Sequence, residues 1–225
     1  MIWLTVVFFP LLPAALLGVG GTRRLVCRHG MWAAPLPALA LALAGSGLEP
    51  AVVPALFLQS VLHFGPFGRL FLLLTAVLWT AAGLFAGASF AAEDSRQSRF
   101  AFFFLFSLCG NLGLCVAQDL ASFYVFFALM SFSAYGLIVH EGTDKALRAG
   151  RVYLTMTVIG EVLLASAFFY AGLAGPGPLF SEIAPLLPLH PHGPLILMLA
   201  FTGFGIKAGV LLLHVWLPLA HPAAP

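Results

Sequence analysis

The sequence has little charge and few cysteines, and these two shortages exclude several classes of protein. Only 8% of its 225 residues are charged and 61% are hydrophobic, whereas soluble proteins carry about 25% charged residues. A chain of this composition cannot cover a water-facing surface, so we expect lipid to be its main surrounding. Three cysteines do not form a disulfide framework here, because Cys109 and Cys115 are expected to face different directions on one helix.

Motifs of soluble enzymes and of nucleic-acid-binding proteins are also missing. We find no glycine-rich phosphate loop, no cysteine or histidine cluster at zinc spacing and no Ser/His/Asp arrangement. The net charge of +2 comes from basic residues scattered over short loops, which is not the basic patch of a nucleic-acid-binding surface. The sequence therefore predicts no catalytic site of its own, no bound cofactor or metal, and no nucleic-acid partner.

Apolar stretches of about 20 residues separate the charged clusters, and a helix of this length crosses a hydrocarbon core of roughly 30 Å. Continuous apolar runs favour helices over a β-barrel, whose strands alternate in polarity. The predicted fold is an all-α bundle of about seven transmembrane helices, over residues 2–20, 31–47, 69–90, 100–118, 120–140, 152–173 and 194–213. The proline-containing connections at 49–68 and 174–193 are expected to be excursions outside the membrane.

The basic residues indicate how the bundle is inserted. They gather after the first, third and fifth stretches, as Arg23, Arg24, Arg28, Arg96, Arg99, Lys145, Arg148 and Arg151. Arg69, at the start of the third stretch, is an exception. The positive-inside rule places the odd-numbered connections in the cytoplasm and the N-terminus outside. We expect an integral protein of a bacterial inner (plasma) membrane, without a cleaved signal peptide because no cationic region precedes the first stretch.

Two charged residues lie away from the loops, Glu161 in the middle of the sixth stretch and Lys207 two thirds along the seventh. A charge at the centre of a membrane helix costs about 2.5–3.5 kcal/mol on insertion scales, so each needs a partner or a water-filled cavity. Since consecutive spans are usually neighbours, we expect the two side chains to meet. They would form either a proton-handling pair or a static ion pair that holds the helices together.

The residues around Lys207 predict an interrupted helix. Glycines flank the lysine in GFGIKAG, and three prolines follow in the segment 218–225. In transporters, a spanning helix that is broken in this way builds ion sites. His214 and His221 frame the break, and histidine exchanges protons near neutral pH. The alternative is that both histidines are polar residues at the membrane surface.

The seventh stretch, GIKAGVLLLHVWLPLAHPAAP, closely resembles the GIKAG…LHxWLPDAHPAAP signature of antiporter-like, proton-conducting membrane subunits. This family occurs in respiratory NADH:quinone oxidoreductase (complex I), group 4 hydrogenases, formate hydrogenlyases and multisubunit sodium/proton antiporters. Further matches lie upstream, in GRLFLLLTAVLW, AQDLASFYVFFALMSFSAYGLIVHE, ALRAGRVYLTMTVIGE and FSEIA. The resemblance covers roughly residues 65–225.

The resemblance implies roles for individual residues. Lys207 would accept and pass protons along a hydrophilic axis within the membrane, and His221 would relay them toward one side. Asp119 would be the acidic residue at the mouth between the fourth and fifth helices. The resemblance also implies other membrane subunits as partners and protons, with sodium as a second candidate, as the transported ions.

The chain departs from the family pattern in its carboxylates and in its length. The glutamate of the family phrase WELMS is Ala128, the aspartate of WLPDAHP is Leu219, and an aspartate before the third helix corresponds to Gly65. Glu161 is then the intramembrane carboxylate left to serve Lys207. Family members contain two inverted repeats within about fourteen helices, whereas this chain ends within the break of the seventh.

These departures define the expected organisation and the competing functions. Residues 1–99 would form a three-helix membrane segment with an external excursion, and residues 100–225 an incomplete first repeat with helices four to seven. The chain would be a fragment, a split subunit or a degenerate member. The leading hypothesis is an ion-translocating subunit of a redox-driven or antiporter complex, and whether that complex is an enzyme stays open. The alternatives are a non-transporting assembly subunit and a membrane subunit of ion-coupled inorganic-carbon uptake.

Overall fold

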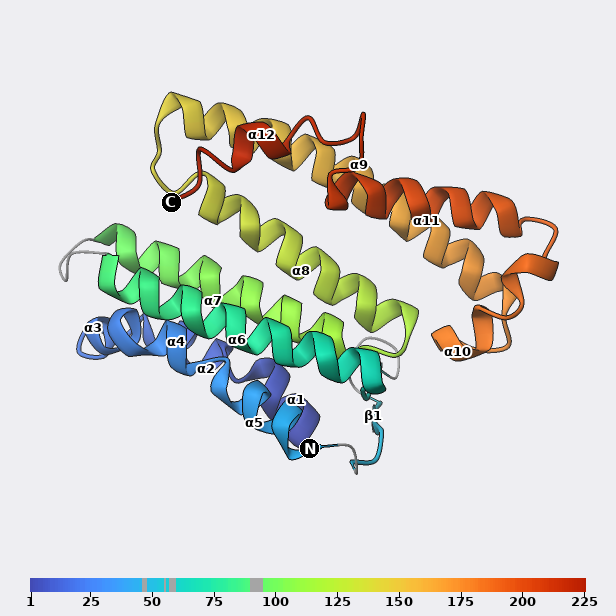
Figure 1. Ribbon diagram of the computed structural model, residues 1–225, viewed down its shortest axis with the longest axis horizontal. Helices are drawn as coiled ribbons and strands as arrows, with labels where there is room; N and C mark the ends of the chain where they lie inside the picture. Colours follow the sequence, from blue (N-terminus) through green and yellow to red (C-terminus); the bar gives the residue numbers. More distant parts are fainter. Residues whose placement is uncertain (46–47, 55, 57–59, 90–94) are drawn as a thin grey trace.

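The computed structural model describes residues 1–45, 48–54, 56, 60–89 and 95–225, which form a bundle of helices (Figure 1). The elements are α1 (Ile2–Phe8), α2 (Leu11–Leu16), α3 (Arg23–Leu25), η1 (Val26–Gly30), α4 (Met31–Ala33), α5 (Leu36–Ala44), β1 (Ala51–Val53), β2 (Ser60–Leu62), α6 (Pro66–Ser89), α7 (Ser95–Val116), α8 (Leu120–Ile138), α9 (Asp144–Ala174), α10 (Phe180–Ile183), η2 (Leu187–Leu189), α11 (Gly193–Ala208) and α12 (Leu217–Ala220). Within the described residues, four helices, α6 to α9, are long and apolar enough to cross a membrane. The predicted class, a bundle of transmembrane helices, is confirmed.

Helices α6, α7 and α8 lie side by side across the middle of the molecule (Figure 1). The N-terminal helices cover α6 and α7 on one side, and α9 packs on α8 with α11 and α12 on the other. Because α7 lies between the N-terminal helices and α8, it is the most buried of the four long helices. Trp3, Leu72, Leu105 and Phe126 join these layers in one apolar core.

The first predicted span, over residues 2–20 and bent by its prolines, is divided into two short helices. Helix α1 ends at Phe8, and α2 covers only Leu11–Leu16. Pro10 and Pro13 have no N–H to donate to the carbonyls four residues earlier, so the helical hydrogen-bond ladder is interrupted twice within one turn. The apolar composition of the segment agrees with its burial, since Trp3 is 2% exposed.

The connection at 49–68 contains two short strands that an all-α prediction does not include. Strands β1 and β2 pair antiparallel, with Val52 opposite Val61. The Val61 N–H then donates to an Asp119 carboxylate oxygen at 2.8 Å, and the Gln118 N–H donates to the Val61 carbonyl at 3.0 Å. The hairpin is thereby attached to the loop between α7 and α8.

The remaining predicted boundaries differ from the structure in smaller ways. Helix α9 begins at Asp144, eight residues before the predicted 152, because Thr143 caps it by accepting a hydrogen bond from the Ala146 N–H at 3.2 Å. Arg69, the exception to the charge pattern, donates to the Ala42 carbonyl at 2.7 Å and so caps the C-terminal end of α5. The predicted ends at residues 47 and 90 lie outside the described residues. The boundary predicted at residue 99 falls within α7, and the two-part division stays a prediction.

Candidate functional site

The predicted break of the helix that carries Lys207 is confirmed. Helix α11 ends at Ala208 because Gly209 adopts a left-handed conformation, with φ of 68°, which side-chain-bearing residues rarely take. The Val210 N–H bonds to the Gly205 carbonyl at 2.9 Å and the Gly209 N–H to the Ile206 carbonyl at 3.3 Å. This is the Schellman arrangement, which satisfies the last carbonyls of a helix.

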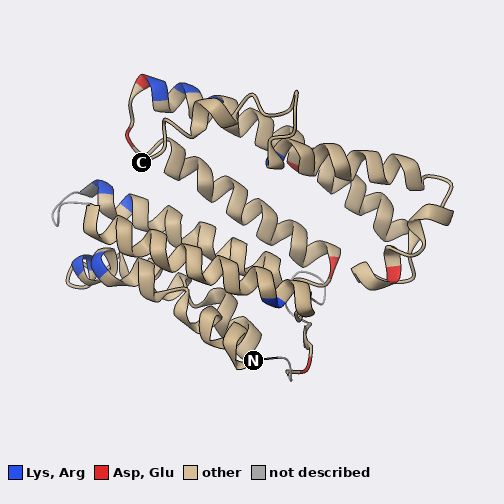
Figure 2. Cartoon of the chain, viewed as in Figure 1, with Lys and Arg blue, Asp and Glu red and all other residues tan. Residues whose placement is uncertain are grey.

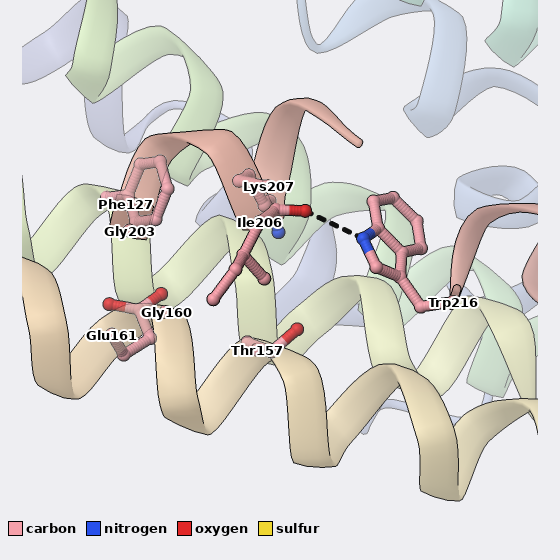
Figure 3. Close-up of a pocket in the computed structure, with 8 residues that line it drawn as sticks. All are labelled: Phe127, Thr157, Gly160, Glu161, Gly203, Ile206, Lys207 and Trp216. Carbon is pink, nitrogen blue, oxygen red and sulfur yellow. Dashed lines mark hydrogen bonds between the residues drawn. The ribbon is translucent and has the colours of Figure 1, made fainter. Parts of the chain in front are cut away.

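The chain that returns after the break strengthens this helix end. The Trp216 indole N–H donates to the Ile206 carbonyl at 2.7 Å, the dashed line in Figure 3. The Trp216 ring also meets the Tyr153 ring of α9 edge to face, with centroids 5.3 Å apart. Trp216 therefore connects the broken helix to α9.

Lys207 lies one residue before the end of α11, and its ammonium group bonds to two neutral hydroxyl groups. Lys207 Nζ donates to Ser131 Oγ of α8 and to the Tyr153 hydroxyl of α9, each at 2.9 Å. The Tyr153 hydroxyl donates in turn to the Ser131 backbone carbonyl at 2.8 Å. The rings of Tyr153 and Phe127 lie 5.3 and 5.7 Å from Nζ, close enough for cation–π attraction.

Glu161 is buried on α9 without a hydrogen-bond partner in the part of the chain that the structure describes. Its side chain is 4% exposed, and neither carboxylate oxygen accepts a hydrogen bond there. The Ser131 hydroxyl and the Lys207 ammonium group lie near its carboxylate, but neither meets the geometry of a hydrogen bond to it. Helices α9 and α11 touch beside it, because a Cβ on Gly203 would lie 3.0 Å from the Gly160 carbonyl oxygen. This close approach brings Glu161 next to the broken helix.

Glu161 and Lys207 line the same small cavity. In Figure 3, Glu161 and Thr157 project from α9 toward α11, while Trp216 lies at one end of the group. The cavity leaves about 10 Å³, about the space that one water molecule needs. Its lining residues are Phe127, Thr157, Gly160, Glu161, Gly203, Ile206, Lys207 and Trp216.

A second, larger cavity of about 460 Å³ is also lined by Lys207. His221, which is exposed and follows α12, lines it together with Asn111 and Tyr153. Lys207 and Trp216 line both cavities. The lysine therefore lies at the boundary between a narrow cavity with Glu161 and a wide cavity with His221.

The other two predicted site residues lie elsewhere. His214 is half-buried between α11 and α12, outside the lining of both cavities, and its Nδ1 has no hydrogen-bond partner among the described residues. Asp119 is the N-cap of α8, and its carboxylate accepts hydrogen bonds from the Ser122 N–H at 2.8 Å and from the Ser122 hydroxyl. Twelve residues separate Asp119 from Ser131, or about 18 Å along the helix. The structure thus brings Glu161, Lys207 and His221 to shared cavities, but not Asp119 or His214.

The structure adds residues that sequence reasoning missed. Ser131, Tyr153 and Trp216 contact Lys207 or the end of its helix, and none of them carries a charge. Ala128 lies in a separate groove between α7 and α8 with Phe102 and other apolar residues. The sequence signal for these three residues was a hydroxyl or indole group within an apolar stretch. Such groups are too common in membrane proteins to identify a site.

Charge and fold together define the class of protein. Charged residues colour mainly the ends of the helices in Figure 2, and the crossing of α9 and α11 is the main interior exception. In the described residues no three His, Cys, Asp or Glu side chains gather at a metal-binding distance. The molecule is a polytopic integral membrane protein with a discontinuous helix.

Residues 117–225 match the family model described as NADH:quinone oxidoreductase/Mrp antiporter, TM. The chain belongs to the family of antiporter-like membrane subunits. It is 35% identical over 166 residues to NADH-quinone oxidoreductase subunit N of Desulforudis audaxviator, over 68% of this chain and 31% of the relative. It is 32% identical over 133 residues to hydrogenase-4 component B of Escherichia coli, over 59% of this chain and 20% of the relative.

A third relative, a Na(+)/H(+) antiporter subunit of Bacillus subtilis, is 30% identical over 172 residues, which is 73% of this chain and 34% of the relative. The chain thus spans about a fifth to a third of the length of these curated relatives. Its fold matches a chain in the structure of the Mrp complex from Dietzia sp. DQ12-45-1b with a TM-score of 0.83 and 21% identity, over 100% of this chain and 44% of that one. A chain of the archaeal membrane-bound sulfane sulfur reductase matches with a TM-score of 0.77 and 24% identity, over 99% of this chain and 48% of that one.

Proposed function

We propose that this chain is an ion-translocating subunit of a multisubunit membrane complex, with Lys207 as the group that takes up and releases the transported proton. The observation that carries the proposal is the position of Lys207 at a helix break, on the boundary of two cavities. A side chain in this position can exchange a proton with either cavity by a small movement. The kinds of complex named for the relatives support this function.

Glu161 and His221 are the proposed exchange partners on the two sides. Glu161 is buried in the narrow cavity without a hydrogen bond among the described residues, so its carboxylate has free acceptor positions for a proton or a water molecule. His221 is exposed and lines the wide cavity, where histidine can exchange protons near neutral pH. A proton would pass between Glu161 and His221 through Lys207.

The test is ion translocation in vesicles that contain the assembled complex. We expect Lys207→Ala to abolish translocation and Glu161→Gln to reduce it at least tenfold, with the complex still assembled. The matched controls are Lys145→Ala and Glu182→Gln, which change exposed residues of the same types and should leave translocation unchanged. Translocation at the control rate in Lys207→Ala would refute the proposal.

A non-transporting assembly subunit is the second candidate. It is favoured by the hydrogen bonds of Lys207, which go to neutral hydroxyl groups of two neighbouring helices and could serve packing alone. This function predicts that Lys207→Ala lowers the amount of assembled complex, while each assembled complex translocates at the normal rate. Quantifying assembly and translocation in the same vesicles separates the two functions.

A further inference from the structure

The ammonium group of Lys207 is held by an arrangement that contains no carboxylate. Its two hydrogen bonds, each of 2.9 Å, go to Ser131 Oγ and to the Tyr153 hydroxyl. These hydroxyls belong to different helices, and the Tyr153 hydroxyl also bonds to the Ser131 carbonyl at 2.8 Å. Glu161 lies nearby but makes no hydrogen bond within the described part of the chain. We call Ser131 Oγ and the Tyr153 hydroxyl the hydroxyl cradle.

The two hydroxyl groups differ in how their own protons are used. Tyr153 donates its single proton to the Ser131 carbonyl, so its oxygen can only accept a hydrogen bond from Lys207. Ser131 Oγ accepts from Lys207, and its own proton can rotate about the Cβ–Oγ bond. Tyr153 is therefore a fixed acceptor, while Ser131 can change from acceptor to donor.

We propose that Ser131 and Tyr153 are positioning residues that hold Lys207 at the boundary of the two cavities in both its protonated and its neutral state. The proposal rests on the proposed function, in which Lys207 gains and loses a proton. The ammonium form donates to both hydroxyls. The neutral amine still donates to Tyr153, and the Ser131 hydroxyl turns to donate to the nitrogen lone pair. An ionised carboxylate partner can only accept, so it offers no donor to the lone pair of the neutral amine.

The other titratable and charged groups around Lys207 stay the same when Ser131 or Tyr153 is substituted by an uncharged residue. The titratable side chains that face it are Glu161 and Tyr153 of α9 and His221 after α12. Helix α8 presents Phe127 and Ser131, while α6 and α7 present uncharged residues to the wide cavity. Substitutions in the cradle therefore change the hydrogen bonds of Lys207 without adding or removing a charge at neutral pH.

The experiment is acetylation of Lys207 as a function of pH, read by mass spectrometry on the assembled complex. Acetic anhydride reacts with neutral amines, and Lys207 lines the wide cavity, through which the reagent can approach. The chain has two lysines, so exposed Lys145 is an internal reference in every sample. The measured quantity is the pH at which half of the maximal Lys207 labelling rate is reached.

The double variant Ser131→Ala/Tyr153→Phe should lower this midpoint by about one to two pH units. Hydrogen bonds to a charged group are about twice as strong as neutral ones, so the ammonium form loses more than the amine. Tyr153→Phe alone should give most of the shift and Ser131→Ala less, because Ser131 serves both forms. Ser131→Thr retains the hydroxyl and should restore the wild-type midpoint. Tyr170→Phe, on the same helix but distant from the cradle, is the matched control.

A midpoint unchanged in both Tyr153→Phe and the double variant would overturn the proposal. A merely structural role would change the labelling rate at every pH through altered access and leave the midpoint in place. If the double variant fails to assemble, the two single variants supply the same measurement. Failure of the proposed function is distinct, since it would appear as normal translocation in Lys207→Ala whatever the labelling midpoint does.

Discussion

Among the residues that the structure describes, two acidic side chains are buried, and they differ in how their oxygens are satisfied. Asp119, at the start of α8, is 1% exposed and accepts hydrogen bonds from Val61, from Ser122 N–H and from the Ser122 hydroxyl. Glu161, in the middle of α9, is 4% exposed and accepts none in the described part of the chain. Burial alone therefore does not separate the two.

The difference separates a structural carboxylate from a candidate functional one. Buried polar groups in folded proteins are nearly always hydrogen-bonded, and Asp119 follows this rule because it caps a helix and holds a strand. An unsatisfied carboxylate next to a lysine and a cavity is an exception that requires another reason. We infer that the α8 start depends on Asp119 for stability, while the α9–α11 crossing does not depend on Glu161.

The largest expected effect is in Asp119→Ala. Loss of the N-cap and of the acceptor for the partly buried Val61 N–H should lower the free energy of unfolding by about 3 kcal/mol. Thr143→Ala removes the cap of α9 alone and should cost about 1 kcal/mol. Chemical unfolding of the detergent-solubilised protein measures both, and equal small losses would contradict the structural role of Asp119.

The end of α11 at Gly209 should depend on the conformation of the backbone, whereas the start of α8 depends on the side chain of Asp119. Gly209→Ala places a side chain at a φ of 68° and should cost about 1–2 kcal/mol of unfolding free energy. Gly20→Ala is the control, because nothing lies within 4 Å of its Cβ position and its φ is not in the left-handed region. The same small change in both variants would show that Gly209 does not determine the break.

A smaller effect is expected in Trp216→Phe. The variant keeps an aromatic ring against Tyr153 but loses the 2.7 Å hydrogen bond to the Ile206 carbonyl, which should cost about 1 kcal/mol. Trp32→Phe loses a longer, exposed hydrogen bond of 3.3 Å to His29 and should be nearly neutral. Thermal unfolding followed by circular dichroism compares the two, and equal stability would contradict a role for Trp216 at the break.

The smallest stability effect should belong to Glu161→Gln. Because no hydrogen bond joins Glu161 to Lys207, we expect a change in unfolding free energy below about 1 kcal/mol, whereas breaking a tight buried ion pair costs about 3–5 kcal/mol. A loss of that larger size would make Glu161 as structural as Asp119 and remove the contrast. The measurement is the unfolding free energy of Glu161→Gln, compared with that of Asp119→Ala in the same detergent.

Some of the site could be predicted from local signals in the sequence. Lys207 and Glu161 stand out because charge is rare within apolar stretches, and Gly209 with the prolines that follow predicts the break of α11. These signals are local, since the cost of burying a charge and the backbone preferences of glycine and proline apply whatever the neighbours are. For the same reason the existence of α6 to α9 followed from their length and hydrophobicity.

Other features depend on contacts between distant residues. The attachment of Asp119 to the β-hairpin requires Val61, 58 positions earlier, and the hydroxyl cradle joins Lys207 to Ser131 and Tyr153, which lie 76 and 54 positions away. No spacing rule connects such residues along the chain. Sequence reasoning therefore missed Ser131 and Tyr153, while the role of Asp119 in ion translocation, which the family resemblance implies, stays a prediction.

The sequence by itself determined that this protein lies in a membrane and that the helix carrying Lys207 is broken beside this lysine. Hydrophobicity, charge and backbone preference are properties of single residues and short segments, so they can be evaluated without a fold. Only the tertiary structure decided which buried acid is satisfied, which hydroxyls hold Lys207 and which cavities it borders. A hydrogen bond exists only where packing brings a donor and an acceptor together, and in this molecule the packing of α8, α9 and α11 does so.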